Sequence, residues 1–209
     1  MKKLLLLPIF AMFLAFCGAA SAQSVDSNNP DTLIKTVTQQ VLDQIKSDNK
    51  IQSGDINEIT KLVNEKILPY TDFTRATRLV MGRNWNTATP EQQKQIVEQF
   101  KMLLIRTYSG ALAQVRNQTI QYKPFRASPD DTDVVVRSVV MNNGQPVELD
   151  YRLYKTAQGW RVYDINVLGA WLIQAYQQQF NEQIQQHGVN GLVQFLTQRN
   201  QQLANGKAS

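Results

Sequence analysis

Cysteine and histidine are almost absent from this sequence. Its 209 residues contain one cysteine, Cys17, and one histidine, His187. Zinc sites need several ligands of these two types, so the sequence predicts no metal site. Cys17 lies in an N-terminal segment that we expect to be removed, and the remaining chain would then carry no disulfide. Its stability therefore has to come from a hydrophobic core.

Motifs of the common catalytic sites are also missing. The sequence has no Gly-x-Ser-x-Gly elbow and no glycine-rich phosphate loop before a predicted helix. His187 falls in the last turn of a predicted helix, before Gly188, where the helix dipole favours a histidine, and this interpretation is preferred to a catalytic base. Asp150 and Asp164 could approach each other across predicted strands, although solvated or paired carboxylates are the ordinary interpretation. We predict no catalytic residue, no cofactor and no enzymatic activity.

Charge of one sign is not concentrated either. The chain has 22 Lys and Arg against 17 Asp and Glu, a formal net charge of +5, which becomes +3 without Lys2 and Lys3. A mildly basic chain attracts anionic partners only weakly. Because no basic cluster is interleaved with aromatic residues, nucleic acid is not an expected partner.

The N-terminus has the pattern of a secretory signal peptide. Two lysines precede an apolar run over residues 4–16, and Ala20-Ser21-Ala22 fits the small-x-small cleavage rule. Cleavage after Ala22 would remove residues 1–22 and leave 23–209 as a single domain. The apolar run is too short to span a membrane as a helix. A lipoprotein signal at Cys17 is the alternative, but it requires a small residue where bulky Phe16 stands.

Helical periodicity dominates residues 30–117. Apolar residues at helical spacing predict helices over about 30–46, 55–68, 73–81 and 90–117. Asn29 before Pro30, and Asp72 before the third helix, are predicted N-caps. Thr89 and Gln92 have the spacing of a capping box at the start of the longest helix.

The pattern changes to a period of two over residues 118–167. Four strands are predicted over 119–125, 133–141, 146–155 and 160–167, and short polar turns join the last three into an antiparallel meander. Residues 168–203 return to helical spacing and predict two glutamine-rich helices, over about 168–187 and 191–203. The fold class is therefore α+β, a twisted antiparallel sheet of about four strands with about six or seven helices around it.

Residues 159–180 carry more apolar and aromatic side chains than one buried face of a strand and helix would need. Two interpretations follow from the residues alone. The excess could fill an ordinary core, or it could line a pocket for an apolar ligand.

Several motifs in one order resemble the toluene-tolerance, or MlaC, family. The segment from Leu68 to Leu112 carries Pro-Tyr-x-Asp-Phe at 69–73, Arg-Leu-Val-Met-Gly at 78–82, Trp85, Ala-Thr-Pro-Glu-Gln at 88–92 and Arg-Thr-Tyr at 106–108. Gly-Trp-Arg-Val-Tyr-Asp at 159–164 and Gly-Val-Asn-Gly-Leu at 188–192 continue the likeness over nearly the whole mature chain. Trp171 is bulkier than the family pattern suggests, which would trim a cavity.

The resemblance implies a nuclear-transport-factor-like sheet wrapped by helices around a hydrophobic pocket. It implies a periplasmic phospholipid carrier that holds acyl chains and maintains outer-membrane lipid asymmetry. Its expected partners are phospholipid, an inner-membrane ABC transporter complex with a lipid-binding hexamer, and an outer-membrane lipoprotein–porin complex. The chain itself is expected to be a monomer. The lipid-binding residues that the resemblance and the apolar faces predict are Phe73, Val80, Phe100, Leu103, Leu104, Tyr108, Val147, Leu149, Tyr151, Leu153, Trp160, Val162, Leu172 and Tyr176.

Two other functions stay open from the residues. A periplasmic chaperone for apolar segments or lipoproteins would need an open groove, and an enzyme on this fold would need perturbed carboxylates in its pocket. No tight arginine cluster is evident in the sequence, and Arg75, Arg78, Arg83 and Arg106 are candidates for a mildly basic rim. Weak head-group selectivity is therefore expected.

Overall fold

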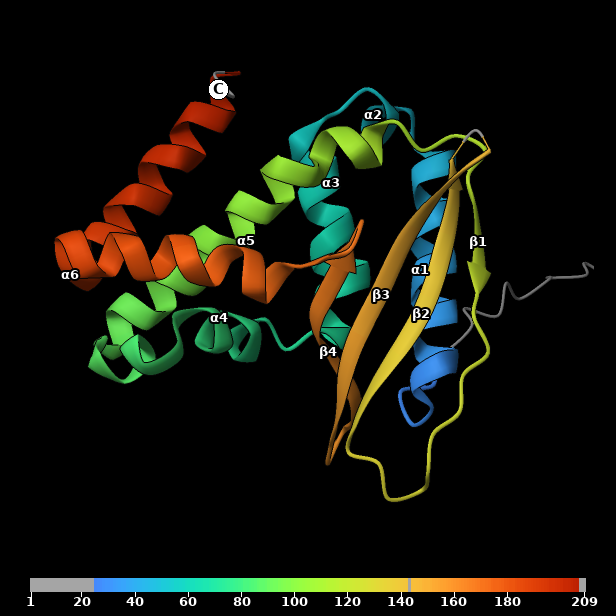
Figure 1. Ribbon diagram of the computed structural model, residues 1–209. Helices are drawn as coiled ribbons and strands as arrows, with labels where there is room; N and C mark the ends of the chain where they lie inside the picture. The colour runs from blue at the N-terminus through green and yellow to red at the C-terminus, as the bar shows by residue number, and fades with distance from the viewer. Residues whose placement is uncertain (1–24, 143, 207–209) are drawn as a thin grey trace, which may run out of the picture.

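The computed structural model describes residues 25–142 and 144–206, drawn in Figure 1. The predicted signal peptide and its cleavage site after Ala22 lie outside the described residues. The helical half comes first, and its elements are α1 (Pro30–Ser47), α2 (Asn49–Gln52), α3 (Ile56–Leu62), the π-helical turn η1 (Val63–Ile67), the 3₁₀ turns η2 (Leu68–Tyr70) and η3 (Gly82–Thr87), α4 (Phe73–Met81) and α5 (Pro90–Ala113).

The predicted caps set where these helices begin. The Asn29 side chain accepts hydrogen bonds from the Asp31 and Thr32 N–H groups at the start of α1. Thr89 and Gln92 form the reciprocal capping box of α5. Each cap satisfies N–H donors that the first helical turn leaves without partners, so the local sequence fixes these boundaries.

The sheet has five strands in the order β1-β2-β3-β4-β5, all antiparallel. The first four are β1 (Thr119–Tyr122), β2 (Asp133–Asn142), β3 (Gln145–Thr156) and β4 (Gly159–Val167). β1 ends before the predicted residue 125. Lys123 still donates to the Arg137 carbonyl, but Pro124 has no N–H to continue the ladder. A two-residue strand, β5 (Ala170–Trp171), was not predicted.

One long element, α6 (Leu172–Ala204), contains both predicted C-terminal helices. Gly188 interrupts it with φ 68° and ψ −176°, and Figure 1 shows the change of direction. The predicted helix over about 168–187 begins at Leu172, because residues 168–171 form a turn and β5. The α+β class and the antiparallel meander are confirmed.

Buried apolar side chains form three clusters. The helical cluster joins α4, α5 and α6, and the sheet cluster joins α1 to one face of β2, β3 and β4. The third cluster joins α1, α2, α3 and α5. In Figure 1, α1 runs behind the sheet, while α4, α5 and α6 pack together beside it.

Candidate functional site

The fourteen predicted lipid-binding residues fall into two equal groups by burial. Seven are buried: Val80, Phe100, Leu103, Tyr151, Leu153, Trp160 and Val162. Seven are only partly buried: Phe73, Leu104, Tyr108, Val147, Leu149, Leu172 and Tyr176. Six of them lie in or against the helical cluster and five in or against the sheet cluster, while Tyr108, Val147 and Leu172 belong to neither.

Phe100 is the centre of the helical cluster and is 2% exposed. Its ring centroid lies 5.0 Å from those of Tyr176 and Phe180 and 5.5 Å from that of Phe73. Edge-to-face and tilted ring pairs at these distances are favourable beyond the apolar area that they bury. The Phe100 side chain is therefore part of a packed core.

The inner face of the sheet, which faces α1, is covered unevenly. At its covered end, Val134, Val136, Leu153 and Val162 are buried in the sheet cluster. At its open end, five apolar residues are only partly buried: Ile120, Val140, Val147, Leu149 and Val167. The register places Ile120, Val140 and Val147 side by side on three strands, with Leu149 beside Val167.

These side chains still expose apolar surface, and burial of that surface would be favourable. Tyr108 of α5 and Leu172 of α6 are also partly buried, and neither belongs to the helical or the sheet cluster. Burial raises the pKa of the Tyr108 and Tyr176 hydroxyls, so both stay neutral and suited to an apolar neighbour.

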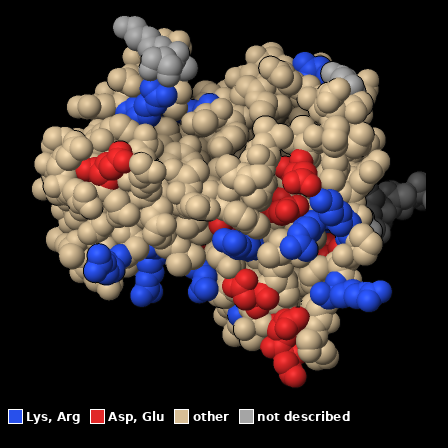
Figure 2. Space-filling view, in the orientation of Figure 1, with Lys and Arg blue, Asp and Glu red and all other residues tan. Residues whose placement is uncertain are grey.

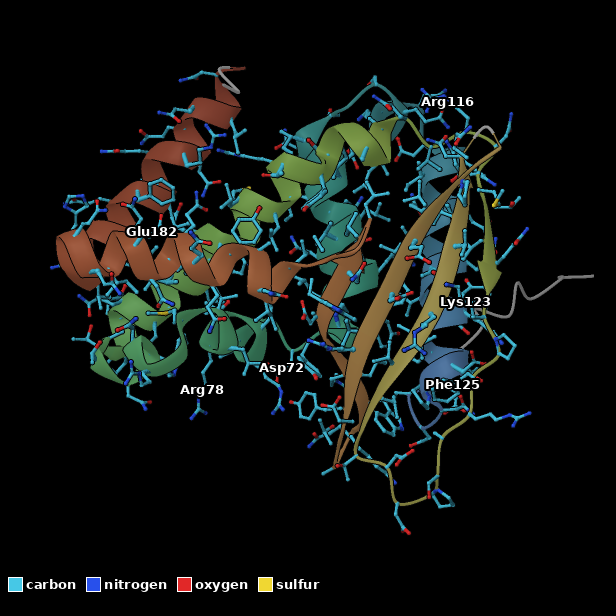
Figure 3. The ribbon with its side chains drawn as sticks, viewed as in Figure 1. Asp72, Arg78, Arg116, Lys123, Phe125 and Glu182 are labelled. Atoms are coloured by element: carbon cyan, nitrogen blue, oxygen red, sulfur yellow. The ribbon has the colours of Figure 1, made fainter. Side chains whose placement is uncertain are left out.

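A polar group on the outer face of the sheet fixes the start of α4. Asp72 accepts a hydrogen bond from the Tyr154 hydroxyl and caps α4 at the Arg75 N–H, and its own N–H donates to the Val162 carbonyl. The Arg75 guanidinium lies 4.0 Å from the centre of the Tyr154 ring and 5.1 Å from that of Tyr163. Figure 3 shows Asp72 where α4 meets the sheet, and Arg78 pointing away from α4 into solvent.

A buried carboxylate fixes the start of α6 in a similar way. Asp164 accepts hydrogen bonds from the Ile165 and Ile173 N–H groups, at 3.0 and 3.1 Å, and pairs with Arg152 at 3.3 Å. The Arg152 guanidinium lies 3.9 Å from the centre of the Trp171 ring. Burial raises the pKa of Asp164, although the two N–H donors and Arg152 oppose this shift.

The two aspartates considered from the sequence as an acid–base pair have other neighbours. Asp164 is opposite Arg152 in the register, and Asp150 is opposite Arg137 and Asn166. Arg106 also has a structural contact, because its guanidinium donates to the Asn200 carbonyl and joins α5 to α6.

No group of three or more metal-ligating side chains occurs in residues 25–142 and 144–206. Within the same ranges, no helix is both long and apolar enough to cross a membrane.

Two surface clefts open elsewhere. One, of about 450 Å³, is lined by glutamine and asparagine side chains and Glu182 of α6. The other, of about 390 Å³, lies between α4, α5 and the β3–β4 hairpin and includes Phe73 alone of the fourteen predicted residues. No pattern in the sequence groups the residues of this second cleft, because they come from distant segments.

Comparison with known proteins identifies the family. A model of the family described as "MlaC protein" matches residues 35–198. The chain belongs to the MlaC family. Two relatives match this chain over much of their length. The toluene tolerance protein ttg2D of Pseudomonas putida is 25% identical over 84% of this chain and 82% of its own. The intermembrane phospholipid transport system binding protein MlaC of Haemophilus influenzae is 23% identical over 68% of each chain.

A solved structure is more similar in sequence to this chain than these two relatives are. It is a phospholipid-binding protein from Ralstonia solanacearum in complex with a phospholipid. The two chains are 56% identical, with a TM-score of 0.82, over 83% of this chain and 98% of the other. At this identity and TM-score, the two chains share their fold.

Proposed function

We propose that this protein is a periplasmic phospholipid-binding transport protein that carries lipid between the two membranes of the envelope. The observation that carries the proposal is the likeness to the phospholipid-bound Ralstonia protein, at 56% identity over 98% of that chain. Membership of the MlaC family supports the same function.

The physical need for a carrier is large. A diacyl lipid has roughly 30 methylenes, and burial of each contributes about 0.8 kcal/mol, so about 24 kcal/mol opposes its free passage through water. A carrier therefore needs apolar surface that is accessible when empty and covered when loaded. The open end of the sheet has this property, since its five apolar residues are only partly buried.

Within the predicted set, the seven partly buried residues are our candidates for direct contact with acyl chains. Side chains such as Val147, Leu149 and Tyr108 can lose further exposed area to a ligand. Buried side chains such as Phe100 and Leu153 have almost no such area left. They hold the fold on either side of the lipid.

Localisation and partners are part of this proposal. A signal peptide cleaved after Ala22 delivers residues 23–209 to the periplasm as a single lipid-binding domain. There, an outer-membrane lipoprotein–porin complex and an inner-membrane ABC transporter complex exchange lipid with the monomeric carrier. The protein performs no reaction on its cargo. It uses no cofactor and binds phospholipid as cargo.

The test is the lipid content of the protein purified from the periplasm without detergent. We expect mass spectrometry of an organic extract to find phospholipid near one molecule per chain. The mass of the intact protein should begin at Gln23 and carry no diacylglyceryl adduct. A lipid-free extract, together with no uptake from labelled vesicles, would exclude the carrier function.

A further inference from the structure

The solvent-facing side of α4 and η3 carries positive charge without negative charge. Residues 73–90, which include both elements, contain three arginines, Arg75, Arg78 and Arg83, and no aspartate or glutamate. Arg75 and Arg78 are one helical turn apart and lie on the same side of α4, whose opposite side is buried in the helical cluster. Figure 2 shows basic side chains along the edge of the molecule that α4 and η3 form, with no acidic side chain between them.

Two of these arginines have no partner within the part of the chain that the structure describes. The side chains of Arg78 and Arg83 are exposed, and neither makes a hydrogen bond or ion pair with residues 25–142 or 144–206. Arg75 is held in place, because its guanidinium stacks on the rings of Tyr154 and Tyr163. Arg78 and Arg83 therefore offer charge that no described residue neutralises.

An apolar side chain lies among these charges. Leu79 is 38% exposed, and among the described residues only Leu168 is also an exposed large hydrophobic residue. Leu79 follows Arg78 in α4 and is exposed on the same side of the helix. We call Arg75, Arg78, Leu79 and Arg83 the α4 face. A partner that covers the α4 face gains both charge neutralisation and burial of apolar surface.

We propose that the α4 face binds the surface of an anionic phospholipid bilayer. A guanidinium donates two parallel hydrogen bonds to phosphate oxygens, and the negative potential of such a bilayer attracts cations close to it. Phosphates cover this surface continuously, so Arg78 and Arg83 find partners in many orientations. This suits side chains that no contact holds in place, whereas an acidic protein would need carboxylates at matching positions. Leu79 enters the head-group region beside the two arginines.

This contact goes beyond the binding of cargo, because no residue of the α4 face is among the fourteen predicted lipid-binding residues. Three of the four arginines that the sequence suggested for a basic rim thus meet on one surface, while Arg106 joins α5 to α6. Few charges take part and salt screens them, so the contact is weak and reversible. A weak contact keeps the protein close to a membrane and still allows it to leave.

The test is flotation of the purified protein with two kinds of vesicle, phosphatidylcholine alone and phosphatidylcholine mixed with phosphatidylglycerol. Wild type should float with the anionic vesicles only, and added salt should release it. Arg78→Gln with Arg83→Gln should lower the binding constant for anionic vesicles about tenfold, since each arginine near such a surface strengthens binding severalfold. Leu79→Ala should lower it about two- to threefold, because less apolar surface enters the head-group region.

Arg126→Gln with Arg137→Gln is the matched control, because it removes the same net charge from two exposed arginines outside the α4 face. This pair should leave the binding constant within about twofold of wild type, since its charges lie farther from the bilayer. Every variant should keep the wild-type amount of extractable phospholipid, because the α4 face does not hold the cargo.

Three results would overturn the inference. Wild type could fail to float with the anionic vesicles, or the control pair could lose as much binding as the α4 pair, in which case net charge alone attracts the protein. Binding to polyglutamate without binding to anionic vesicles would assign the α4 face to an acidic protein instead. The lipid content tests the carrier function separately: wild type without extractable lipid that still floats through Arg78 and Arg83 would support the α4 face and refute the carrier.

Discussion

The two ends of the sheet's inner face consist of the same types of residue but are covered differently. At the covered end, Leu153 of β3 is fully buried beneath α1. Four residues earlier on the same strand and face, Leu149 is only partly buried. Alternation along a strand gives both residues the same orientation. What differs is how completely the surrounding side chains cover them, because Leu153 lies within the sheet cluster and Leu149 packs at its edge. We therefore assign stability to one end and propose ligand contact at the other.

The helical half of the protein repeats this contrast. Phe100 is enclosed by three aromatic rings, whereas Leu104, one turn further along α5, is partly buried at the edge of the same cluster. Both lie on the apolar side of one helix. A wall defined by periodicity alone therefore mixes residues that stabilise the fold with residues that can contact cargo.

The largest expected effect comes from the matched pair on β3. Leu153→Asn should lower the free energy of unfolding by about 4 kcal/mol or more, because it loses a buried leucine and buries an amide without partners. Leu149→Asn should cost about 1 kcal/mol and leave a folded protein with much less bound lipid. Urea unfolding and the lipid-to-protein ratio measure the two effects. Equal stability losses in both variants would remove the distinction between the two ends.

The pair on α5 should give a somewhat smaller contrast. Phe100→Ala should destabilise the protein by about 3–4 kcal/mol, since the cavity left among Phe73, Tyr176 and Phe180 cannot fully collapse. Leu104→Ala should cost about 1 kcal/mol, because this side chain already contacts solvent. If Phe100→Ala kept its stability and lost only its lipid, Phe100 would have to be counted among the ligand contacts.

The contact that joins α6 to the sheet predicts a pH dependence. Burial raises the pKa of Asp164, so the folded protein keeps a proton that the unfolded chain releases. The stability that Asp164 contributes is thus fully present below the ordinary carboxyl pKa, and it is lost as the pH rises through the raised value. Asp164→Asn cannot titrate. The unfolding free energy of wild type minus that of the variant should fall as the pH rises from the ordinary carboxyl range through the raised pKa of Asp164.

A constant difference over this range would show that the carboxylate is compensated by Arg152 and its two N–H donors. The measurement is urea unfolding at matched ionic strength. Arg152→Gln serves as a second probe, because loss of the guanidinium should raise the pKa of Asp164 further and shift the same fall to higher pH.

The smallest effect is expected near the open end. Leu168 has φ 54°, the one positive φ outside glycine among the described residues, and its side chain is 70% exposed. Leu168→Gly should stabilise the protein by about 0.5–1 kcal/mol by relieving this conformation. Leu79→Gly is the control, because Leu79 is 38% exposed within α4, where glycine should cost about 1 kcal/mol. Thermal denaturation of both variants measures the difference. If Leu168→Gly instead destabilised the protein, contacts of the Leu168 side chain would outweigh the cost of its positive φ.

The sequence by itself determined the secondary structure and much of the order of the fold. Asn29, Asp72 and the Thr89–Gln92 pair cap helices where their spacing predicts, since a cap acts on N–H groups two or three residues away. The short polar turns predicted the antiparallel meander, because a hairpin turn is also set by a few neighbouring residues. The exceptions are also local, because β5 has only two residues and Pro124 shortens β1.

Only the tertiary structure decided which apolar residues are core and which remain partly exposed. Periodicity shows the face of a helix or strand on which a residue lies, but not what covers that face. Three features depend on contacts between distant segments. Leu153 is buried within the sheet cluster, and Asp164 accepts a hydrogen bond from the Ile173 N–H. Arg161 lies in the same cleft as Glu98 and Lys101. Such contacts follow from how the helices and sheet pack together, because close packing in three dimensions leaves no periodic trace along the chain.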